Sequence, residues 1–417
     1  MAQEKIILLK NIRTAGYTGT LDAYKKAGGY TALKKVLDKM KPVDVVNTVK
    51  ASGLRGRGGA GFPTGMKWSF MAKNTGKPSY LICNADESEP GTFKDHLLMM
   101  RDPHQFIEGM IIGCYALDCH HGYIYIRGES QYAIKNMQKA IDDAYAAGLL
   151  GKNILKKGYD LDLTIHPGAG AYICGEETAL LDSLEGKRGQ PRFKPPFPAV
   201  SGYDASPTSV NNVETLTCLP FIINEGPEAF AKIGTPNNSG THLVSISGHV
   251  NKPGVYEIEM GVPLRTIIDE FAGGVRNGKK VKAVIPGGAS ANILKASELD
   301  VPYDFDSLAK AGTMMGSSAV MVFDEDTNMV EVAYRTIKFF NHESCGQCTP
   351  CREGTNWLKS MIREFMDNAG NEELMQRVVR VSGNLMGTTI CAFGDATGGP
   401  MRTFVQKFPE EFRKHVA

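Results

Sequence analysis

The sequence has almost no excess of charge of either sign. Its 417 residues include 47 Lys and Arg against 45 Asp and Glu, which gives a formal net charge of +2 at pH 7. A protein that binds nucleic acid or an anionic membrane surface through its charge would need a clear basic excess. The composition therefore argues against nucleic acid as a partner.

Long apolar runs are also missing. The first ten residues contain too short an apolar run for a secretory signal. The longest apolar stretches, such as residues 109–117, are far shorter than the ~20 residues that a membrane-spanning helix needs. We therefore expect a soluble or peripheral protein with no direct membrane insertion. Nine cysteines, three of them closely spaced, favour a metal site in a reducing compartment over a disulfide framework.

Glycine, by contrast, is concentrated in one stretch. Six of the eighteen residues at 53–70 are glycine. The stretch also holds cations and flat apolar rings: Arg55, Arg57, Lys67, Phe62, Trp68 and Phe70. Backbone N–H groups in such a loop can cradle a phosphate, and the rings suit a purine or a flavin. The stretch predicts a binding loop for a phosphorylated aromatic cofactor; the alternative is an ordinary glycine-rich surface turn.

Three of these glycines match the dinucleotide-binding fingerprint formally. Gly56, Gly58 and Gly61 have its spacing, but that fingerprint should follow a strand and open a helix. The preceding residues, 43–52, look helical instead. The sequence therefore does not predict a standard Rossmann turn at this position.

Polar side chains follow two predicted strands at the point where each strand ends. Residues 79–83 form a short apolar strand that is followed by Asn84, Asp86, Glu87 and Glu89. Residues 161–165 form another, and a small-residue loop leads from it to a helix that begins near Gly175, with Glu176 and Glu177 in its first turn. Strand ends are where α/β sheets place ligand groups, and an acidic side chain there can bind ribose hydroxyls. For each residue the alternative is a helix cap or an interaction with the helix dipole.

Alternating strands and helices organise the first 240 residues. The predicted order is helix 42–52, strand 79–83, helix 103–117, strand 122–127, helix 130–147 and strand 161–165. This alternation is typical of a parallel sheet with helices on its faces. Prolines exclude regular structure from the basic segment 186–209, which is either a linker or part of the site. A helix headed by Asn211 and Asn212 then reaches about residue 223.

Two further domains are predicted after residue 240. Residues 241–325 are expected to form a small β-grasp-like α+β domain, with strands at 243–247, 254–259, 281–285 and 319–323 and a helix at 263–271. This domain contains no cluster of catalytic residue types, so we interpret it as structural. Residues 326–417 are expected to form a helical bundle, with helices near 327–341, 352–366, 372–385 and 401–416. The predicted fold is an α/β multidomain protein in which residues 1–240 combine an N-terminal helical segment with a Rossmann-like flavin- and nucleotide-binding domain.

Four cysteines of the last domain have the spacing of an iron–sulfur site. Cys345, Cys348 and Cys351 lie at i, i+3 and i+6, and Cys391 follows forty residues later. This pattern matches ligation of a [4Fe–4S] cluster. The alternatives are structural zinc, which usually takes two paired Cys-x-x-Cys units, and free thiols. Cys114, Cys119 and Cys174 are interpreted as packing residues.

With these motifs in place, the sequence resembles the flavin- and NADH-binding subunit of respiratory complex I, in the family of NADH:quinone oxidoreductase flavoprotein subunits. The resemblance covers nearly the whole chain and is carried by residues 53–70, 83–91, 168–181, 194–197, 211–214 and 344–354. It implies a member of this NADH dehydrogenase family that takes a hydride from NADH onto FMN and passes electrons singly to the cluster. The same body occurs in diaphorase subunits of soluble NAD-reducing hydrogenases and formate dehydrogenases, which stay an alternative. A zinc-binding scaffold protein is the alternative without enzyme activity.

The resemblance also implies the cofactors and their contacts. The cofactors are noncovalent FMN, a [4Fe–4S] cluster and NAD(H), and the flavin does the chemistry without a catalytic acid or base. FMN contacts are expected at Gly56, Arg57, Gly58, Lys67, Asn84, Asp86, Glu87, Tyr172, Gly175, Glu176, Asn211 and Asn212. NADH contacts are expected at Phe62, Phe70, Glu89, Glu177, Lys194 and Phe197, with Glu89 and Glu177 positioning NADH. The cluster ligands are expected to be Cys345, Cys348, Cys351 and Cys391.

The resemblance finally implies partners and a place in the cell. We expect a small thioredoxin-like [2Fe–2S] subunit and the large iron–sulfur subunit of a peripheral arm as partners. The expected location is the cytoplasm, peripheral to the inner face of the cell membrane as part of a complex. One departure stands out, because Phe393 takes the place of a smaller aliphatic residue usual in relatives. It leaves the packing beside the cluster and the flavin open.

Overall fold

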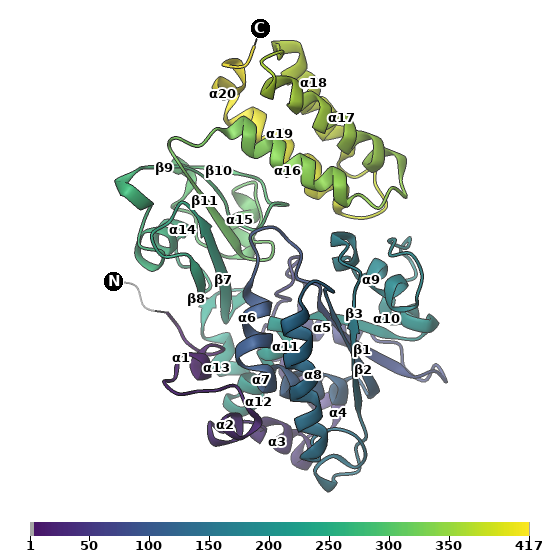
Figure 1. The fold of residues 1–417 in the computed structure, drawn as a ribbon. Helices are drawn as coiled ribbons and strands as arrows, with labels where there is room; N and C mark the ends of the chain where they lie inside the picture. Colours follow the sequence, from purple (N-terminus) through teal and green to yellow (C-terminus); the bar gives the residue numbers. More distant parts are fainter. Residues whose placement is uncertain (1–3, 417) are drawn as a thin grey trace.

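A parallel four-stranded sheet forms the centre of the N-terminal part of the computed structural model, which describes residues 4–416 (Figure 1). The spatial order is β3–β2–β1–β4, and every neighbouring pair is parallel. The strands are β1 Ser79–Ala85, β2 Cys119–Ile126, β3 Asp162–Pro167 and β4 Thr208–Asn212. The predicted strands at 79–83, 122–127 and 161–165 are confirmed as β1, β2 and β3. Helices lie on both faces of this sheet, as in Rossmann-like folds.

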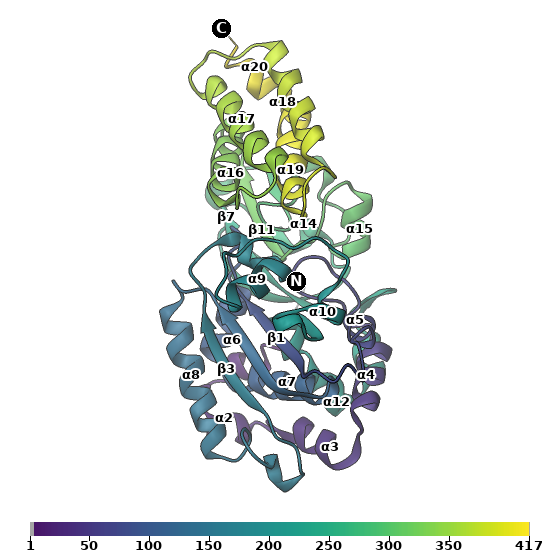
Figure 2. The ribbon, with the colours of Figure 1, turned by 90° about the vertical axis from the view of Figure 1, so that its right-hand side faces the viewer.

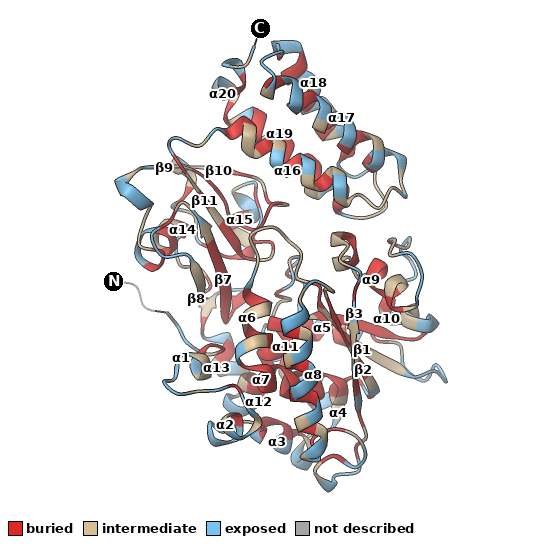
Figure 3. Cartoon of the chain, viewed as in Figure 1, coloured by how far each residue is buried: buried red, intermediate tan, exposed pale blue. Residues whose placement is uncertain are grey.

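Alternating side chains of β1 enter two different cores. Leu81 and Cys83 belong to the large N-terminal core, whereas Ile82 belongs to a core shared with α9 and the cysteine-bearing loop. The helices of this part are α1 Lys10–Arg13, α2 Leu21–Lys26, α3 Thr31–Lys39, α4 Pro42–Ala51, α5 Thr64–Ser69, α6 Lys94–Arg101, α7 Pro103–Ala116, α8 Gln131–Ala146, α9 Glu177–Leu184, α10 Pro198–Ser201, α11 Val213–Thr217, α12 Leu219–Glu225 and α13 Pro227–Ala231. Helix α7 is buried along nearly its whole length (Figure 3), which accounts for the apolar run at 109–117.

Strand β4 was not predicted from the sequence. It follows the proline-rich segment, and its five residues gain their strand structure by pairing with β1, Leu81 opposite Ser209 and Asn84 opposite Asn212. That pairing is a tertiary contact that local sequence does not reveal. The expected helix then begins at Val213, and Asn212 is its cap, since its side chain accepts a hydrogen bond from the Glu214 N–H.

A mixed five-stranded sheet follows, in the order β10–β9–β11–β7–β8. Its strands are β7 Thr241–Gly248, β8 Gly254–Glu259, β9 Val281–Ile285, β10 Leu294–Lys295 and β11 Ala319–Asp324. β11 pairs parallel with β7, and the other neighbours are antiparallel, which fits the predicted β-grasp-like unit. Helix α14 Leu264–Thr266 continues into a π-helical turn at Ile267–Phe271, and α15 Phe305–Lys310 precedes β11. A small hairpin, β5 Gly234–Thr235 and β6 Asn238–Ser239, connects this sheet to the first part.

Helices form the last part of the chain and lie at the top of Figures 1 and 2. They are α16 Met329–Glu343, α17 Thr349–Met366, α18 Glu372–Leu385, α19 Phe393–Lys407 and α20 Pro409–Arg413. The helix predicted at 401–416 begins earlier, at Phe393, and is interrupted at Phe408. Gly398 allows α19 to approach α18 closely, because a Cβ there would lie 2.4 Å from the Ser382 carbonyl oxygen. Between residues 4 and 416, every helix falls short of the length and apolarity that crossing a membrane requires.

Candidate functional site

A large cavity opens at the carboxyl edge of the parallel sheet. Asn84 of β1 and Asn212 of β4 are paired at this edge, as expected for ligand groups in α/β sheets. The cavity volume is about 1180 Å³, which exceeds the ~300–1,000 Å³ of an ordinary single-ligand site. All the residues predicted to contact FMN or NADH line this cavity: Gly56, Arg57, Gly58, Phe62, Lys67, Phe70, Asn84, Asp86, Glu87, Glu89, Tyr172, Gly175, Glu176, Glu177, Lys194, Phe197, Asn211 and Asn212. No ligand identifies which of them bind which group, so the individual contacts stay predictions.

The glycine loop forms one wall of the cavity and lies in close contact with Asn212 at the end of β4. Gly59 and Gly61 have φ angles of +135° and +62°, which favour glycine. A Cβ at Gly58 would lie 3.0 Å from the Asn212 Cβ. Helix α5 follows and brings Lys67 to the cavity, where its Nζ donates to the Val210 carbonyl oxygen at 2.7 Å.

The predicted FMN contact of Arg57 stays a prediction, and its side chain has partners within the protein. Its side chain is fully buried, and its guanidinium donates to the carbonyl oxygens of Arg55, Ser239 and Thr241. Its backbone N–H donates to the Thr215 hydroxyl at 2.8 Å. The Arg57 guanidinium therefore holds the end of β6 and the start of β7, and both Arg57 and Lys67 line the cavity.

Two carboxylates that follow β1 in the chain, Asp86 and Glu87, differ in their hydrogen bonding. Glu87 accepts hydrogen bonds from the N–H groups of Asp95 and His96, at 2.8 and 2.9 Å, and so caps the first turn of α6. Burial, together with Asp95, raises the pKa of Glu87 to about 7. Burial also raises the pKa of Asp86 to about 7, but Asp86 Oδ2 is buried without a hydrogen-bond partner.

Three residues that line the cavity carry a buried polar atom without a hydrogen-bond partner in the protein. They are Asp86 with its Oδ2, Thr64, at the start of α5, with its hydroxyl, and Arg57 with its Nε. Arg57 Nε still lies 4.0 Å from Glu214 Oε1. Because buried polar atoms are rarely left unpaired, the atoms of Asp86 and Thr64 are the ones that a polar ligand would satisfy. The amides at the strand ends are already oriented: Asn84 donates to the Gly175 carbonyl oxygen, and Asn211 accepts from the Trp68 indole.

At its mouth the cavity is lined by charges and by exposed rings. Glu177 Oε1 lies 2.7 Å from Lys194 Nζ, and its Oε2 lies 3.5 Å from Lys67 Nζ. Although burial opposes the change, the two lysines hold the pKa of Glu177 below its usual value. The side chains with large exposed apolar faces are Phe62, Phe70 and Phe197, of which 46%, 56% and 57% are exposed. Such rings can stack on a purine.

Tyr172 joins the cavity to the cysteine-bearing part of the chain. Its N–H donates to the Glu343 carboxylate of α16 at 2.9 Å. Its ring packs edge-on against Phe340 and Phe393, with centroid distances of 6.0 and 5.9 Å. Phe393, the departure noted in the sequence, thus fills the boundary between the cavity and the helical bundle.

The four predicted cluster ligands lie in one region. Cys345 and Cys348 precede α17, Cys351 lies in its first turn, and Cys391 precedes α19. All four pack in the same hydrophobic core, and every cysteine of the chain is a free thiol. Among residues 4–416, no set of His, Cys, Asp and Glu converges as a ready-made site for a single metal ion. Four thiolates from one loop and one distant turn are the donor set that a [4Fe–4S] cluster uses.

Sequence reasoning missed most of one wall of the cavity, of which it had singled out Cys391 and Phe393 alone. The second sheet and the bundle contribute the lining residues Ser290, Asn292, Thr313, Met314, Gly316, Ser317, Met386, Cys391, Ala392, Phe393, Asp395, Ala396 and Gly399. The β-grasp-like unit is therefore part of the site rather than only structural. Small, uncharged residues supply most of this wall, so the residue types gave no signal in the sequence.

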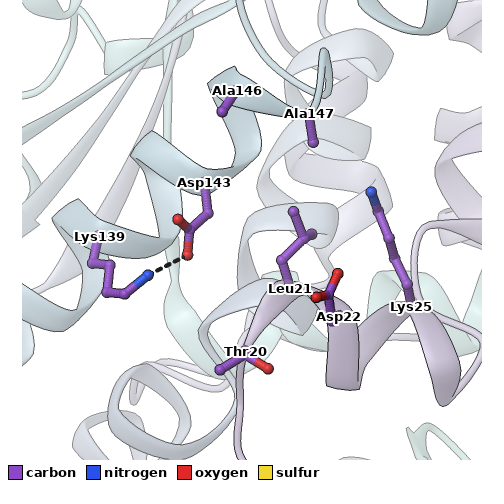
Figure 4. Close-up of a pocket in the computed structure, with 8 residues that line it drawn as sticks. All are labelled: Thr20, Leu21, Asp22, Lys25, Lys139, Asp143, Ala146 and Ala147. Carbon is purple, nitrogen blue, oxygen red and sulfur yellow. Dashed lines mark hydrogen bonds and ion pairs between the residues drawn. The ribbon is translucent and has the colours of Figure 1, made fainter.

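A second hollow lies on the far side of the N-terminal part, between α2 and α8 (Figure 4). Its volume is about 510 Å³, and its charges are partly self-paired, since Lys139 and Asp143 lie 2.7 Å apart. Within the described chain, the buried polar atoms that lack partners all lie elsewhere. This hollow shows no chemistry directed at a ligand.

Three family models match consecutive parts of the chain. The Nuo51 FMN-binding domain matches residues 49–220, the SLBB domain residues 242–322, and the NADH-ubiquinone oxidoreductase-F iron-sulfur binding region residues 331–415. These matches fall on the parallel-sheet part, the mixed sheet and the helical bundle.

Several curated relatives that are named as F subunits of NADH-quinone oxidoreductases match over nearly the full length. The second F subunit of Rhizobium meliloti is 51% identical over 411 residues, 98% of this chain and 97% of the relative. The F subunit of Streptomyces coelicolor is 49% identical over 95% of this chain and 88% of its own length. The F subunit of Rickettsia typhi is 49% identical over 95% and 94%.

A solved structure shares the fold as well. A chain of an NAD+-reducing [NiFe]-hydrogenase in the H2-reduced state superposes with a TM-score of 0.85 and 35% identity. The match covers 93% of this chain but 65% of the hydrogenase chain. The air-oxidised state of such a hydrogenase gives the same TM-score with 34% identity.

Proposed function

The chain belongs to the family of NADH-quinone oxidoreductase F subunits, and from this we propose that it works as an NADH dehydrogenase flavoprotein subunit, the entry point for electrons from NADH. Its cofactors are FMN and a [4Fe–4S] cluster, with NAD(H) as substrate. When bound, FMN supplies the exchange between two-electron hydride chemistry and single-electron transfer, and the cluster supplies a single-electron carrier.

One observation carries the proposal: a predicted cluster ligand lies in the wall of the predicted flavin cavity. Cys391 and Phe393 line the same cavity as the glycine loop and the carboxylates behind β1. A flavin in that cavity would therefore be separated from the cluster by side chains of one wall. This adjacency supports a relay between the two cofactors, because electron transfer requires that carriers lie close together.

The residues of the cavity divide the work of binding between two ligands. We assign the deep part, with Lys67, Thr64, Asp86 and the strand-end amides, to FMN. The mouth is assigned to NADH: the exposed phenyl rings to the adenine, Lys194 to the phosphates and Glu177 to the ribose. Glu89 lies deeper and is assigned to the nicotinamide side.

None of these groups needs to exchange a proton with substrate. The protein's task is to hold the two rings in contact, at the ~3–3.5 Å typical of a reactive geometry.

The cluster ligands and the division into domains follow from the same proposal. Cys345, Cys348, Cys351 and Cys391 are assigned as the four ligands. The domain limits are proposed at 1–240, 241–325 and 326–417. The family models, which match at 49–220, 242–322 and 331–415, support these limits.

Because its relatives are F subunits, this chain is one subunit of a larger NADH-quinone oxidoreductase. We further propose that its neighbours include a small thioredoxin-like [2Fe–2S] subunit and a large iron–sulfur subunit. The complex would lie at the inner face of the cell membrane, with this chain on the cytoplasmic side.

A diaphorase subunit of a soluble NAD+-reducing hydrogenase is the second candidate. The TM-score of 0.85 over 93% of the chain favours it. The curated NADH-quinone oxidoreductase relatives are more similar, at 49–51% identity over 95–98% of the chain, and we rank the respiratory assignment first. Purification from the native source at natural abundance separates the two: hydrogenase subunits in the same complex would reverse the order.

Acid extraction of the anaerobically purified protein tests the proposed cofactors. We expect FMN, iron and acid-labile sulfide to be released together. Zinc without flavin would instead support the scaffold protein and refute the enzyme.

A further inference from the structure

The carboxylate of Glu89 is held from two distant parts of the chain. Tyr172 donates its hydroxyl proton to Glu89 Oε2 at 2.6 Å. Ser290 donates its backbone N–H to Glu89 Oε1 at 2.8 Å, across 201 residues of sequence. Ser290 lies between β9 and β10 of the second sheet. Both oxygens of Glu89 are thus oriented by neutral donors.

The loop that carries Ser290 is packed directly on Glu89. A Cβ at Gly288 would lie 2.5 Å from Glu89 Cγ, and the φ of Gly288 is +92°, so only glycine fits there without strain. The loop is anchored at both sides, since the Gly288 N–H donates to the Ala319 carbonyl oxygen and the Ala291 N–H to that of Gly288. The position of Glu89 on the cavity wall is therefore coupled to the second sheet.

The side chain of Ser290 also acts on Glu89. Burial raises the pKa of Glu89, and the Tyr172 phenol together with the N–H and the hydroxyl of Ser290 offset part of that rise. Glu177 at the mouth is neutralised by two lysines, whereas Glu89 depends on these hydrogen bonds for its orientation.

We propose that Ser290 is a positioning residue of the nucleotide site, which fixes Glu89 and thereby sets how tightly NADH is held at its nicotinamide end. The inference rests on the function proposed above and deepens it. It gives the mixed sheet a direct part in substrate binding.

The test uses three variants of the intact, cofactor-loaded protein. Ser290→Ala removes the hydroxyl but keeps the N–H, and Ser290→Thr restores a hydroxyl. Ser307→Ala is the matched control, since it removes another serine hydroxyl that donates to a carboxylate, that of Asp304 at 3.1 Å, at a residue of α15 that does not line the cavity. We measure KM for NADH and kcat with an artificial acceptor, the FMN content, and the EPR signal of the cluster.

For Ser290→Ala we expect KM to rise about three- to tenfold, the effect of weakening one hydrogen bond to a charged group. kcat, FMN content and the EPR signal should stay near the wild-type values. Ser290→Thr should recover most of the KM, and Ser307→Ala should leave it unchanged. An unchanged KM in Ser290→Ala, an equal rise in Ser307→Ala, or loss of FMN from Ser290→Ala would each overturn the positioning role.

A double-mutant cycle tests that Ser290 acts through Glu89. In a Glu89→Gln background, Ser290→Ala should have little further effect on KM, because coupled residues are not additive. Full additivity would overturn the inference. Failure of the proposed function would be recognised separately, because the wild-type protein itself would then show no bleaching of flavin absorbance by NADH, and both proposals would fall.

Discussion

The cofactor cavity and the cysteine site share a wall but are assembled in opposite ways. Three of the four cysteines lie within seven residues, and one loop brings them together. The cavity collects its lining from strand ends, the glycine loop, the proline-rich segment, the second sheet and α19. The spacing of nearby residues can therefore reveal a cluster site, whereas a site for a large cofactor depends mostly on tertiary structure.

The two ends of the cavity show a second contrast within the same residue type. Glu177 at the mouth is paired with Lys67 and Lys194, and its pKa is lowered. Asp86 in the deep part is buried, and its pKa is raised to about 7. Under the proposed assignment these two carboxylates face different partners, Glu177 the ribose hydroxyls of the substrate and Asp86 the resident flavin.

The largest effect is expected when the cysteine site is destroyed and the cofactor cavity is left intact. Cys351→Ala should abolish the cluster EPR signal, because a cube that loses one of its four thiolates is not retained, while the flavin stays bound in the cavity. Cys114→Ala is the control, since Cys114 is buried in α7, away from the cysteine loop. An intact cluster signal in Cys351→Ala would remove this residue from the ligand set.

A change at the mouth should alter substrate choice and leave both cofactors in place. Glu177→Ala removes the anion that is proposed to face the ribose, whereas Lys67 and Lys194 stay. Two like charges about 4 Å apart at an effective dielectric constant of 20 repel by roughly 4 kcal/mol, so relief of part of this for the 2′-phosphate of NADPH is worth about tenfold or more. The ratio of kcat/KM for NADH to that for NADPH should fall accordingly.

Glu185→Ala is the control for that measurement. Glu185 follows the same helix α9 and is paired with Arg192 and Lys187, but it is not among the lining residues of the cavity. Its removal should leave the ratio unchanged. If Glu177→Ala also leaves it unchanged, Glu177 serves only the helix dipole.

Asp86, in the deep part of the cavity, should make the stability of the FMN-depleted protein depend on pH. The pKa of Asp86 is raised from 3.8 to about 7, so the folded state favours the protonated form. The resulting stabilisation is present below pH ~4 and is lost as the pH rises through about 7, by at most about 4 kcal/mol. Asp86→Asn should flatten the change in Tm between about pH 4 and 7.

Asp118→Asn provides the comparison for Asp86, because the Asp118 side chain is 84% exposed. It should follow the wild-type pH profile. A wild-type slope that persists in Asp86→Asn would place the responsible group elsewhere, such as Glu87 or Glu257, whose pKa values burial also raises to about 7.

The smallest effect is expected at the boundary between the two sites. Phe393→Leu keeps an apolar side chain between Tyr172 and Phe340 but loses the edge-on ring contacts, which are worth about 0.5–1.5 kcal/mol each. We expect both cofactors to be retained, a small fall in Tm, and a change of less than about threefold in the rate of cluster reduction in rapid-freeze EPR, since volume-conserving swaps are tolerated best. Loss of either cofactor would show that the ring is required to hold it.

The sequence allowed prediction of whatever is encoded by local pattern. The strands β1, β2 and β3, the cysteine set and the polar strand ends follow from short-range periodicity and spacing. Strand β4 did not, because its five residues are held by pairing with β1. The orientation of the Arg57 side chain could not be predicted either, since its carbonyl partners at Ser239 and Thr241 lie more than 180 residues away in the sequence.

The second-sheet wall of the cavity was missed for a related reason. Ser290 and Thr313 are ordinary loop residues by type, and their place in the site depends on how the mixed sheet packs against β1 and α6. Glu87 is a further case, because a carboxylate that caps α6 through Asp95 and His96 has the same appearance in sequence as one that binds a ligand.

Anaerobic titration of the purified protein with NADH, followed by absorbance and EPR together, tests the central claim that one wall joins a flavin site to a cluster site. The account predicts that NADH bleaches the flavin absorbance and that the EPR signal of a reduced [4Fe–4S] cluster then appears. In Cys351→Ala the bleaching should persist without the cluster signal. A protein that NADH does not bleach, or whose flavin is reduced while an intact cluster stays oxidised with excess NADH, would contradict it.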